Sequence, residues 1–200
     1  MMYKLLHKIF NFPSKIKRII ENKIKKSQIT SIGDVYLLED SIISNHQNNN
    51  KKIVIGSNTR IRGELSVFPN GGNITIGKDC YVGSSTRIWS MKSIIIGDRV
   101  QISHNVNIHD NNSHSISALM RHRHLMDIYR LGHPNALEDV RMADIIIEDD
   151  VWIGFNSIIF KGVRIGAGSI IQAGSIVNTD VEPYSIFAGN LAQKIAESKK

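Results

Sequence analysis

Residues 147–177 decide the fold, and they read IEDDVW-IGFNSI-IFKGVR-IGAGSI-IQAGSI-V when the chain is divided into sixes. Every unit begins with a large aliphatic residue, from Ile147 to Val177. The fifth position of each unit is small or β-branched, as at Val151 and Ser157. A period of six fits neither an α-helix nor a long half-buried strand, but it fits a short strand and a turn that repeat many times.

The same spacing recurs earlier in the chain, in three triplets of aliphatic residues. They are Ile55, Ile61 and Val67; Ile76, Val82 and Ile88; and Ile96, Ile102 and Ile108. Three units close one triangular coil of about eighteen residues, and stacked coils lie about 4.8 Å apart. We therefore predict an all-β protein built as a parallel β-helix over residues 31–195, in which each of these aliphatic side chains points inward.

The positive charge of the chain belongs to its first 26 residues rather than to the repeats. Residues 1–26 carry eight Lys or Arg and one acidic residue, whereas the remainder carries seventeen basic and seventeen acidic side chains. This distribution argues against nucleic acid as the main ligand, because a nucleic-acid-binding domain usually has a basic face on its folded body. The single cysteine, Cys80, excludes an intrachain disulfide and favours a cytoplasmic protein.

Residues 1–30 are expected to form two short basic helices separated by Pro13. Their apolar stripes are Leu5, Leu6, Ile9 and Phe10 in the first helix, and Ile16, Ile19, Ile20 and Ile24 in the second. Lysine and arginine side chains occupy the opposite face. A basic amphipathic helix of this kind can associate with an anionic membrane surface, or it can cover the exposed first coil of the domain.

The repeat stops for 36 residues after Ile108, which predicts an extruded loop over residues 109–144. A loop of this length inside a compact domain is usually functional. Six of the eight histidines, from His104 to His133, fall within thirty residues around this break. We expect the chemistry of the protein to lie here.

The loop and the coils after it resemble a known family. Residues 106–116 read VNIHDNNSHSI and look like the catalytic loop of the hexapeptide-repeat O-acetyltransferases. That family includes galactoside and maltose acetyltransferases and enzymes that modify capsule and lipopolysaccharide sugars. The later stretches are similar to its C-terminal coils, namely VWIG at 151–154, GVRIG at 162–166, AGS at 173–175 and AGN at 188–190. The resemblance covers residues 53–195.

The resemblance implies a left-handed β-helix, a homotrimer and an acetyl-CoA site in a groove between neighbouring subunits. It maps the catalytic histidine onto His114, which would accept the proton of a sugar hydroxyl as that hydroxyl attacks the thioester. Asp110, four residues earlier, would orient the imidazole; alternatively, it is a turn residue that bonds its own backbone.

Six residues outside the loop are implied to bind the coenzyme: Trp152, Phe155, Ala173, Gly174, Asn178 and Lys194. Small residues at positions 173 and 174 would let the pantetheine arm lie close to the backbone. The chain departs from the family at Asn190-Leu191-Ala192, where the family has Asn-Pro-Ala. Basic residues expected soon afterwards are replaced by Gln193 and Ala196, so Lys194 is a substitute candidate for contact with the coenzyme phosphates.

Three other functions fit parts of the sequence. A zinc site like that of the γ-class carbonic anhydrases would use His104, His109 and His114, but residues 84–89 lack the further histidine that it needs on the preceding coil. A non-catalytic trimeric scaffold would not need a long histidine-bearing loop. An amino-sugar N-acetyltransferase usually adds a nucleotide-binding βαβ domain, for which residues 1–50 are too short, although an amine acceptor stays open. We therefore predict a sugar O-acetyltransferase of surface-polysaccharide biosynthesis, without a metal.

Overall fold

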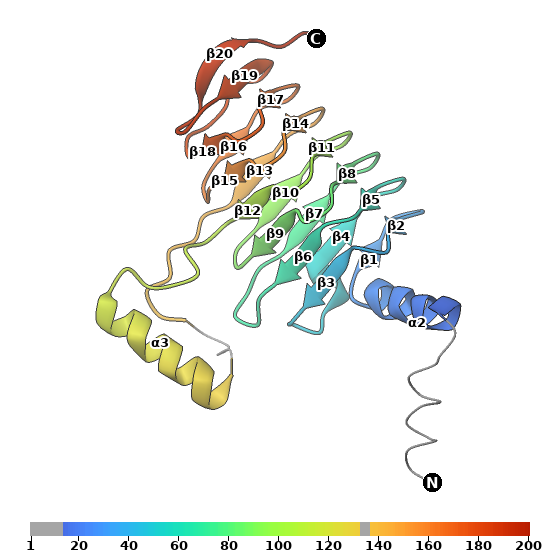
Figure 1. The fold of residues 1–200 in the computed structure, drawn as a ribbon, viewed down its shortest axis with the longest axis vertical. Helices are drawn as coiled ribbons and strands as arrows, with labels where there is room; N and C mark the ends of the chain where they lie inside the picture. The colour runs from blue at the N-terminus through green and yellow to red at the C-terminus, as the bar shows by residue number, and fades with distance from the viewer. Residues whose placement is uncertain (1–13, 133–136) are drawn as a thin grey trace.

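A computed structural model describes residues 14–132 and 137–200 of the chain. The strands are short, and they wind into three sheets that form the sides of a β-helix (Figure 1). The first sheet contains β1 (Thr30–Ser31), β4 (Ile53–Ile55), β7 (Ile74–Ile76), β10 (Ile94–Ile96), β13 (Ile145–Ile147) and β16 (Arg164–Ile165). Each strand pairs in parallel with its equivalent in the next coil.

The second and third sheets repeat this arrangement. The second contains β2 (Tyr36–Leu37), β5 (Arg60–Ile61), β8 (Tyr81–Val82), β11 (Gln101–Ile102), β14 (Trp152–Ile153), β17 (Ile170–Ile171), β19 (Ser185–Ala188) and β20 (Gln193–Glu197). The third contains β3 (Ile42–Asn45), β6 (Glu64–Val67), β9 (Arg87–Ser90), β12 (Asn107–His109), β15 (Ile158–Ile159) and β18 (Ile176–Val177). Only β20 runs antiparallel among the described strands, where it pairs with β19 at the C-terminal end of the β-helix.

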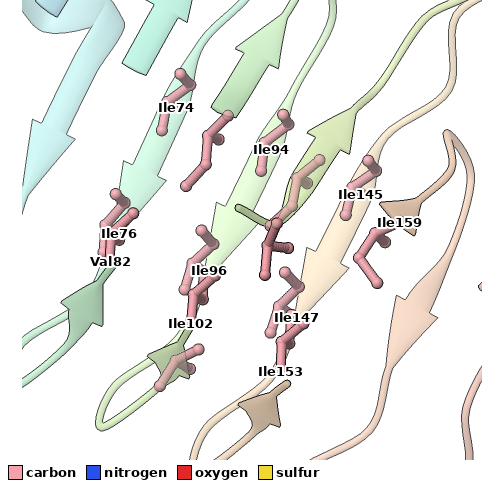
Figure 2. Packing of buried hydrophobic residues seen from close by; sticks show 14 of the residues in the cluster. Ile74, Ile76, Val82, Ile94, Ile96, Ile102, Ile145, Ile147, Ile153 and Ile159 are labelled. Carbon is pink, nitrogen blue, oxygen red and sulfur yellow. The ribbon is translucent and has the colours of Figure 1, made fainter. Parts of the chain in front are cut away.

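The inward aliphatic side chains stack from coil to coil. Ile94 pairs with Ile74 on one side and with Ile145 on the other, and the same rows are visible in Figure 2. Every aliphatic residue that the sequence places at the start of a unit is buried, and so are the fifth-position residues of the last series. The predicted parallel β-helix and the burial of these aliphatic residues are therefore confirmed. The third sheet differs from the predicted triplets at one position, because Leu65 pairs with Ile88, whereas Val67 pairs with Ser90.

One further coil precedes the first triplet that the sequence reveals. In this coil β1, β2 and β3 pair with β4, β5 and β6. Ser31 pairs with Ile55, so a polar residue stands where every later strand of the first sheet carries isoleucine. This serine hides the six-residue pattern. A short 3-10 helix, η1 (Asn50–Lys52), then leads into β4.

The long loop leaves the β-helix after β12 and returns at β13. Its arms begin as a short antiparallel stem, in which the Asn112 N–H donates to the Arg141 carbonyl at 3.0 Å and the Ala143 N–H donates to the Asp110 carbonyl at 2.9 Å. Between the arms lies α3 (Ala118–Leu131), a helix that the sequence analysis does not predict. His133, a member of the predicted histidine group, lies outside the described residues.

The helix α2 (Ser14–Ser27) lies against the first coil, within the segment where the sequence predicts the second basic helix (Figure 1). The contact is made by its polar side. Arg18 Nη1 donates to Glu39 Oε1 at 2.7 Å, and Lys25 Nζ donates to the Glu39 carbonyl and the Ser41 hydroxyl, both at 3.2 Å. The basic side chains Arg18 and Lys25 therefore face the domain, on the helix side opposite the isoleucine stripe.

The isoleucine stripe of α2 points away from the domain. Its members are 41–58 % exposed: Ile16, Ile19, Ile20 and Ile24. The first expected stripe, of Leu5, Leu6, Ile9 and Phe10, lies outside the described residues. Among the helices of residues 14–132 and 137–200, none is long and apolar enough to cross a membrane.

Candidate active site

A buried carboxylate holds the corner at which the loop leaves the β-helix. Asp110 is fully buried, and its oxygens accept hydrogen bonds from the Ser90 hydroxyl at 2.6 Å and from the backbone N–H groups of Met91 at 2.8 Å and Lys92 at 2.9 Å. The Asn111 amide donates a further bond at 2.9 Å. Three of these donors belong to the preceding coil, so Asp110 ties the start of the loop to the repeat beside it.

These contacts differ from both roles that the sequence suggests for Asp110. Its main partners lie about one coil away along the chain rather than in its own turn. Within the described residues, no hydrogen bond joins Asp110 to His114. The structure therefore shows no direct contact through which Asp110 could orient the His114 imidazole. Asp110 instead anchors the loop to the preceding coil.

His114 is exposed on the segment that links the stem of the loop to α3. Its backbone N–H donates to the Asn112 carbonyl at 2.6 Å, and the Ser113 N–H donates to Asn111 Oδ1 at 2.7 Å. Ser113 itself adopts a left-handed conformation with φ of 60°. Among residues 14–132 and 137–200, no side chain forms a hydrogen bond with the imidazole, so both of its nitrogens stay available to a ligand.

The segment after His114 is clamped by α3 and by the returning arm of the loop. Arg121 Nη1 donates to the carbonyls of Ser115 at 3.1 Å and Ile116 at 2.8 Å. The Ser115 hydroxyl donates to Asp139 Oδ2. A histidine that lies outside the repeats is thus held on both sides, as a catalytic group needs to be. The sequence analysis missed Arg121 and Asp139, because these contacts follow no repeat spacing.

Two hollows meet at His114. The first, called the open hollow below, has a volume of about 550 Å³, and its lining includes Asn107, Asn112, Arg121 and Phe160. The second, called the inner cavity, is more enclosed and has a volume of about 220 Å³. It lies between α3 and the corners of earlier coils, with a lining that includes Phe68, Pro69, Trp89, Met91, His124 and Ile128.

His109 stands in the wall of the open hollow, at the end of β12. Its ring stacks on Trp89 of the preceding coil, with the ring centres 4.9 Å apart and the planes 14° from parallel. Burial lowers the pKa of His109, the charge of Arg87 lowers it further, and the charge of Asp110 opposes both. His109 is therefore uncharged at neutral pH. The twenty-residue spacing of a coil could have predicted the pairing of His109 with Trp89.

Three of the expected coenzyme contacts lie together at one corner. Phe155 stacks on His104 of the preceding coil, with ring centres 5.1 Å apart, and its carbonyl accepts a hydrogen bond from the Gly174 N–H at 2.8 Å. Ala173 is exposed beside Gly174, whose φ of 72° is a conformation that favours glycine. Trp152, which is half exposed, lies on the strand that leads into this corner.

The other two expected contacts lie elsewhere. Asn178 follows β18 at the corner where the third sheet leads to the first, and it is exposed there. The Lys194 ammonium forms ion pairs with Glu182 at 2.8 Å and with Glu197 at 2.7 Å. These carboxylates raise the pKa of Lys194. They also compete with any phosphate for its charge, so a coenzyme that used Lys194 would have to displace them.

The histidines considered for a zinc site lie in three different environments. His104 stacks on Phe155, His109 stacks on Trp89, and His114 belongs to the loop. Within the part of the chain that the structure describes, no group of three or more His, Cys, Asp or Glu side chains is placed to hold a metal ion.

Replacement of Asp110 by alanine should lower the free energy of unfolding by about 3 kcal/mol or more, because buried donors at Ser90, Met91 and Lys92 would lose their acceptor. Urea unfolding followed by circular dichroism measures the change. The matched control is Asp144→Ala, which removes a half-exposed partner of Lys92 and should cost less than about 1 kcal/mol. Equal stabilities for the two variants would contradict the anchoring role.

The lowered pKa of His109 predicts that acid destabilises the fold. As the pH falls through about 6.5, the unfolded chain binds a proton at His109 that the folded chain does not, so the free energy of unfolding decreases. The melting temperature should therefore fall between about pH 7.5 and pH 5, and it should fall less in His109→Asn. An unchanged pH dependence in this variant would show that His109 is not the responsible group.

The six-residue repeat of this chain is similar in sequence to the repeats of known proteins. Residues 73–109 and 144–179 match a family model described as the hexapeptide repeat of succinyl-transferase. A chloramphenicol acetyltransferase of Klebsiella aerogenes is 44 % identical over 55 residues, which are 28 % of this chain and 26 % of that protein. A 2,3,4,5-tetrahydropyridine-2,6-dicarboxylate N-acetyltransferase of Staphylococcus aureus is 42 % identical over 64 residues, 32 % of this chain and 27 % of that protein. The chain thus spans about a quarter of the length of these relatives.

Solved structures extend the likeness to the whole fold. A mutant of AntD, an N-acyltransferase from Bacillus cereus, superposes with a TM-score of 0.70 at 24 % identity, over 90 % of this chain and 89 % of that chain. A maltose O-acetyltransferase from Clostridium difficile superposes with a TM-score of 0.57 at 23 % identity, over 98 % and 84 %. At this identity the likeness concerns the fold, and it agrees with the predicted left-handed class. The chain therefore contains hexapeptide repeats over residues 73–109 and 144–179, and it shares its β-helical fold with solved acyltransferases.

Proposed function

We propose that this protein transfers an acyl group from coenzyme A to a sugar, with His114 as the general base. The observation that carries the proposal is the setting of the imidazole, which is free of side-chain hydrogen bonds within the described residues and faces two hollows from a clamped segment. The specific reaction that we favour is O-acetylation of a sugar hydroxyl in surface-polysaccharide biosynthesis.

The chemistry needs one base and one place for the departing sulfur. The acceptor oxygen attacks the thioester carbonyl carbon, and a C–O bond forms as His114 takes the hydroxyl proton. The C–S bond then breaks, and the imidazolium returns the proton to the thiolate of coenzyme A. A neutral imidazole can perform both transfers, because its pKa range lies near neutrality.

The pantetheine arm is proposed to pass the corner formed by Phe155, Ala173 and Gly174, where small residues leave the backbone open. This placement involves a second copy of the chain in a homotrimer, as the resemblance implies. The outer face of the second sheet supports self-association, because Tyr36, Tyr81 and Trp152 are 38–50 % exposed on its parallel strands. A neighbouring subunit could cover this aromatic ladder.

An amine acceptor is the second candidate. This function does not require a βαβ domain, because the AntD structure, an N-acyltransferase in complex with dTDP-4-amino-4,6-dideoxyglucose and coenzyme A, superposes over 89 % of its chain. An N-acyltransferase of an amino sugar can therefore have this architecture alone. Screening free sugars, nucleotide sugars and nucleotide amino sugars for release of the coenzyme A thiol separates the two candidates.

His114→Ala should lower kcat by about 10²–10⁴-fold while coenzyme A binding and oligomeric state are retained, because the variant removes only the proton acceptor. Thiol release, calorimetry and gel filtration measure the three properties. The matched control is His122→Ala, which removes an exposed histidine of the same loop and should leave kcat unchanged. Near-normal activity of His114→Ala would exclude it as the base.

The exposed stripe of α2 supports a further proposal, peripheral association with an anionic membrane. Ile16, Ile19, Ile20 and Ile24 face away from the domain, and Lys17 and Lys23 are exposed near them. Isoleucine side chains would enter the interface, and the lysines would contact acidic headgroups. Such binding would bring the protein to the surface that carries lipid-linked glycans, and a cytoplasmic location stays part of this proposal.

Ile19→Glu/Ile20→Glu should abolish co-sedimentation with vesicles of phosphatidylcholine and phosphatidylglycerol, because two carboxylates would have to enter the headgroup region. The unchanged chain should bind these vesicles and lose binding at high salt. Ile32→Glu, which alters another exposed isoleucine near α2, serves as the control and should still bind. Equal sedimentation of all three proteins would contradict the membrane proposal.

A further inference from the structure

The inner cavity has walls unlike those of the open hollow. Phe68, Met91, Ile128 and Leu137 contribute apolar side chains, and Trp89 adds a large aromatic surface. Its volume is about 220 Å³. A protein cavity of about 150 Å³ holds a benzene molecule, so this cavity has room for a group of six or more heavy atoms. An acetyl methyl group would leave most of it empty.

The cavity reaches the proposed base directly. His114 lines the inner cavity and the open hollow, and Ser113 lines both as well. A group bound in the inner cavity and a group bound in the open hollow would therefore both lie next to His114. Acyl transfer requires this arrangement, because the carbonyl carbon and the attacking atom must meet beside the base.

Unpaired polar atoms collect around these two spaces. Within residues 14–132 and 137–200, three buried side-chain nitrogens lack a hydrogen-bond partner: Trp89 Nε1, His109 Nε2 and His124 Nδ1. Trp89 and His124 line the inner cavity, and His109 lines the open hollow. His124 is only 6 % exposed. Buried polar atoms are usually paired, and exceptions gathered at one place indicate a functional site.

We propose that the inner cavity is the acyl pocket, and that it accepts an acyl chain of about four to six carbons in preference to acetyl. The inference rests on the proposed acyl transfer to a sugar, and it replaces the acetyl donor favoured above with a longer acyl group. A sugar ring fits this cavity poorly, because its several hydroxyls need more partners than the unpaired nitrogens of Trp89 and His124 can supply, and the other walls are mainly apolar. The open hollow, with Asn107, Asn112 and Arg121, suits the sugar.

Binding of the donor tests the pocket without knowledge of the acceptor. Calorimetric titration of the full chain with coenzyme A, acetyl-CoA, butyryl-CoA and hexanoyl-CoA gives four dissociation constants. Each buried methylene should tighten binding about fourfold, so butyryl-CoA should bind about tenfold or more tightly than acetyl-CoA. Equal dissociation constants for acetyl-CoA and butyryl-CoA would overturn the acyl pocket.

A variant of the cavity wall tests where the acyl group of the donor binds. Ile128→Trp should fill part of the inner cavity and reduce the ratio of butyryl-CoA to acetyl-CoA affinity to about one. The matched control is Leu131→Trp, which adds the same ring at an exposed position of α3 and should keep the ratio of the unchanged protein. Retention of the preference in Ile128→Trp would also overturn the proposal, because the acyl chain would then lie elsewhere.

The outcomes separate this inference from the proposed function. If the folded protein binds coenzyme A and acetyl-CoA but gains nothing from longer chains, the acyl pocket fails and acetyl transfer stands. If it binds no form of coenzyme A, the proposed function fails, and the acyl pocket fails with it. If Ile128→Trp weakens binding of the sugar acceptor equally with every donor, the cavity holds the acceptor and the proposal is wrong.

Discussion

The structure depends on the parallel pairing of each strand with its equivalent one coil away. Ile76, Ile96 and Ile147 are successive partners in the first sheet, so each coil buries the inward side chains of its neighbours. A coil alone could not hide this surface, and a shift of one residue would turn the aliphatic side chains outward. Insertions are therefore tolerated only at corners, and any group that is to meet a substrate must lie on a corner, on an outer face or on a segment that leaves the coil.

Asp110 shows how the chain leaves the β-helix without disturbing this pairing. Its carboxylate takes donors from the preceding coil, and its carbonyl accepts the Ala143 N–H at 2.9 Å where the chain returns. One residue thus fixes both ends of the excursion. The strands on either side, β10 and β13, then pair as closely as any others, although 48 residues lie between Ile96 and Ile145. The loop is free to carry chemistry because its base is rigid.

Sequence reasoning succeeded where side chains repeat and failed where they do not. The inward positions of the last series, from Ile147 to Val177, follow directly from the six-residue period, because packing forces identical roles on equivalent positions. The first coil escaped detection since Ser31 breaks the period. The helix α2 has the expected isoleucine stripe. Such a stripe does not show which side of a helix packs against the domain, and in α2 the side that carries Arg18 packs there. The clamp of Arg121 on the His114 segment depends on tertiary contact alone.

The position of His114 also bears on the nature of the acceptor. A hydroxyl keeps its proton until it attacks, so a base must act in the transition state and its removal is costly. An amine that reaches the site uncharged can attack before it loses a proton, and a base then matters less. The segment that carries His114 is held by hydrogen bonds on both sides, an arrangement of value mainly where proton transfer limits the rate. If His114 is the base that we propose, a held imidazole suits a hydroxyl acceptor, and an amine acceptor needs it less.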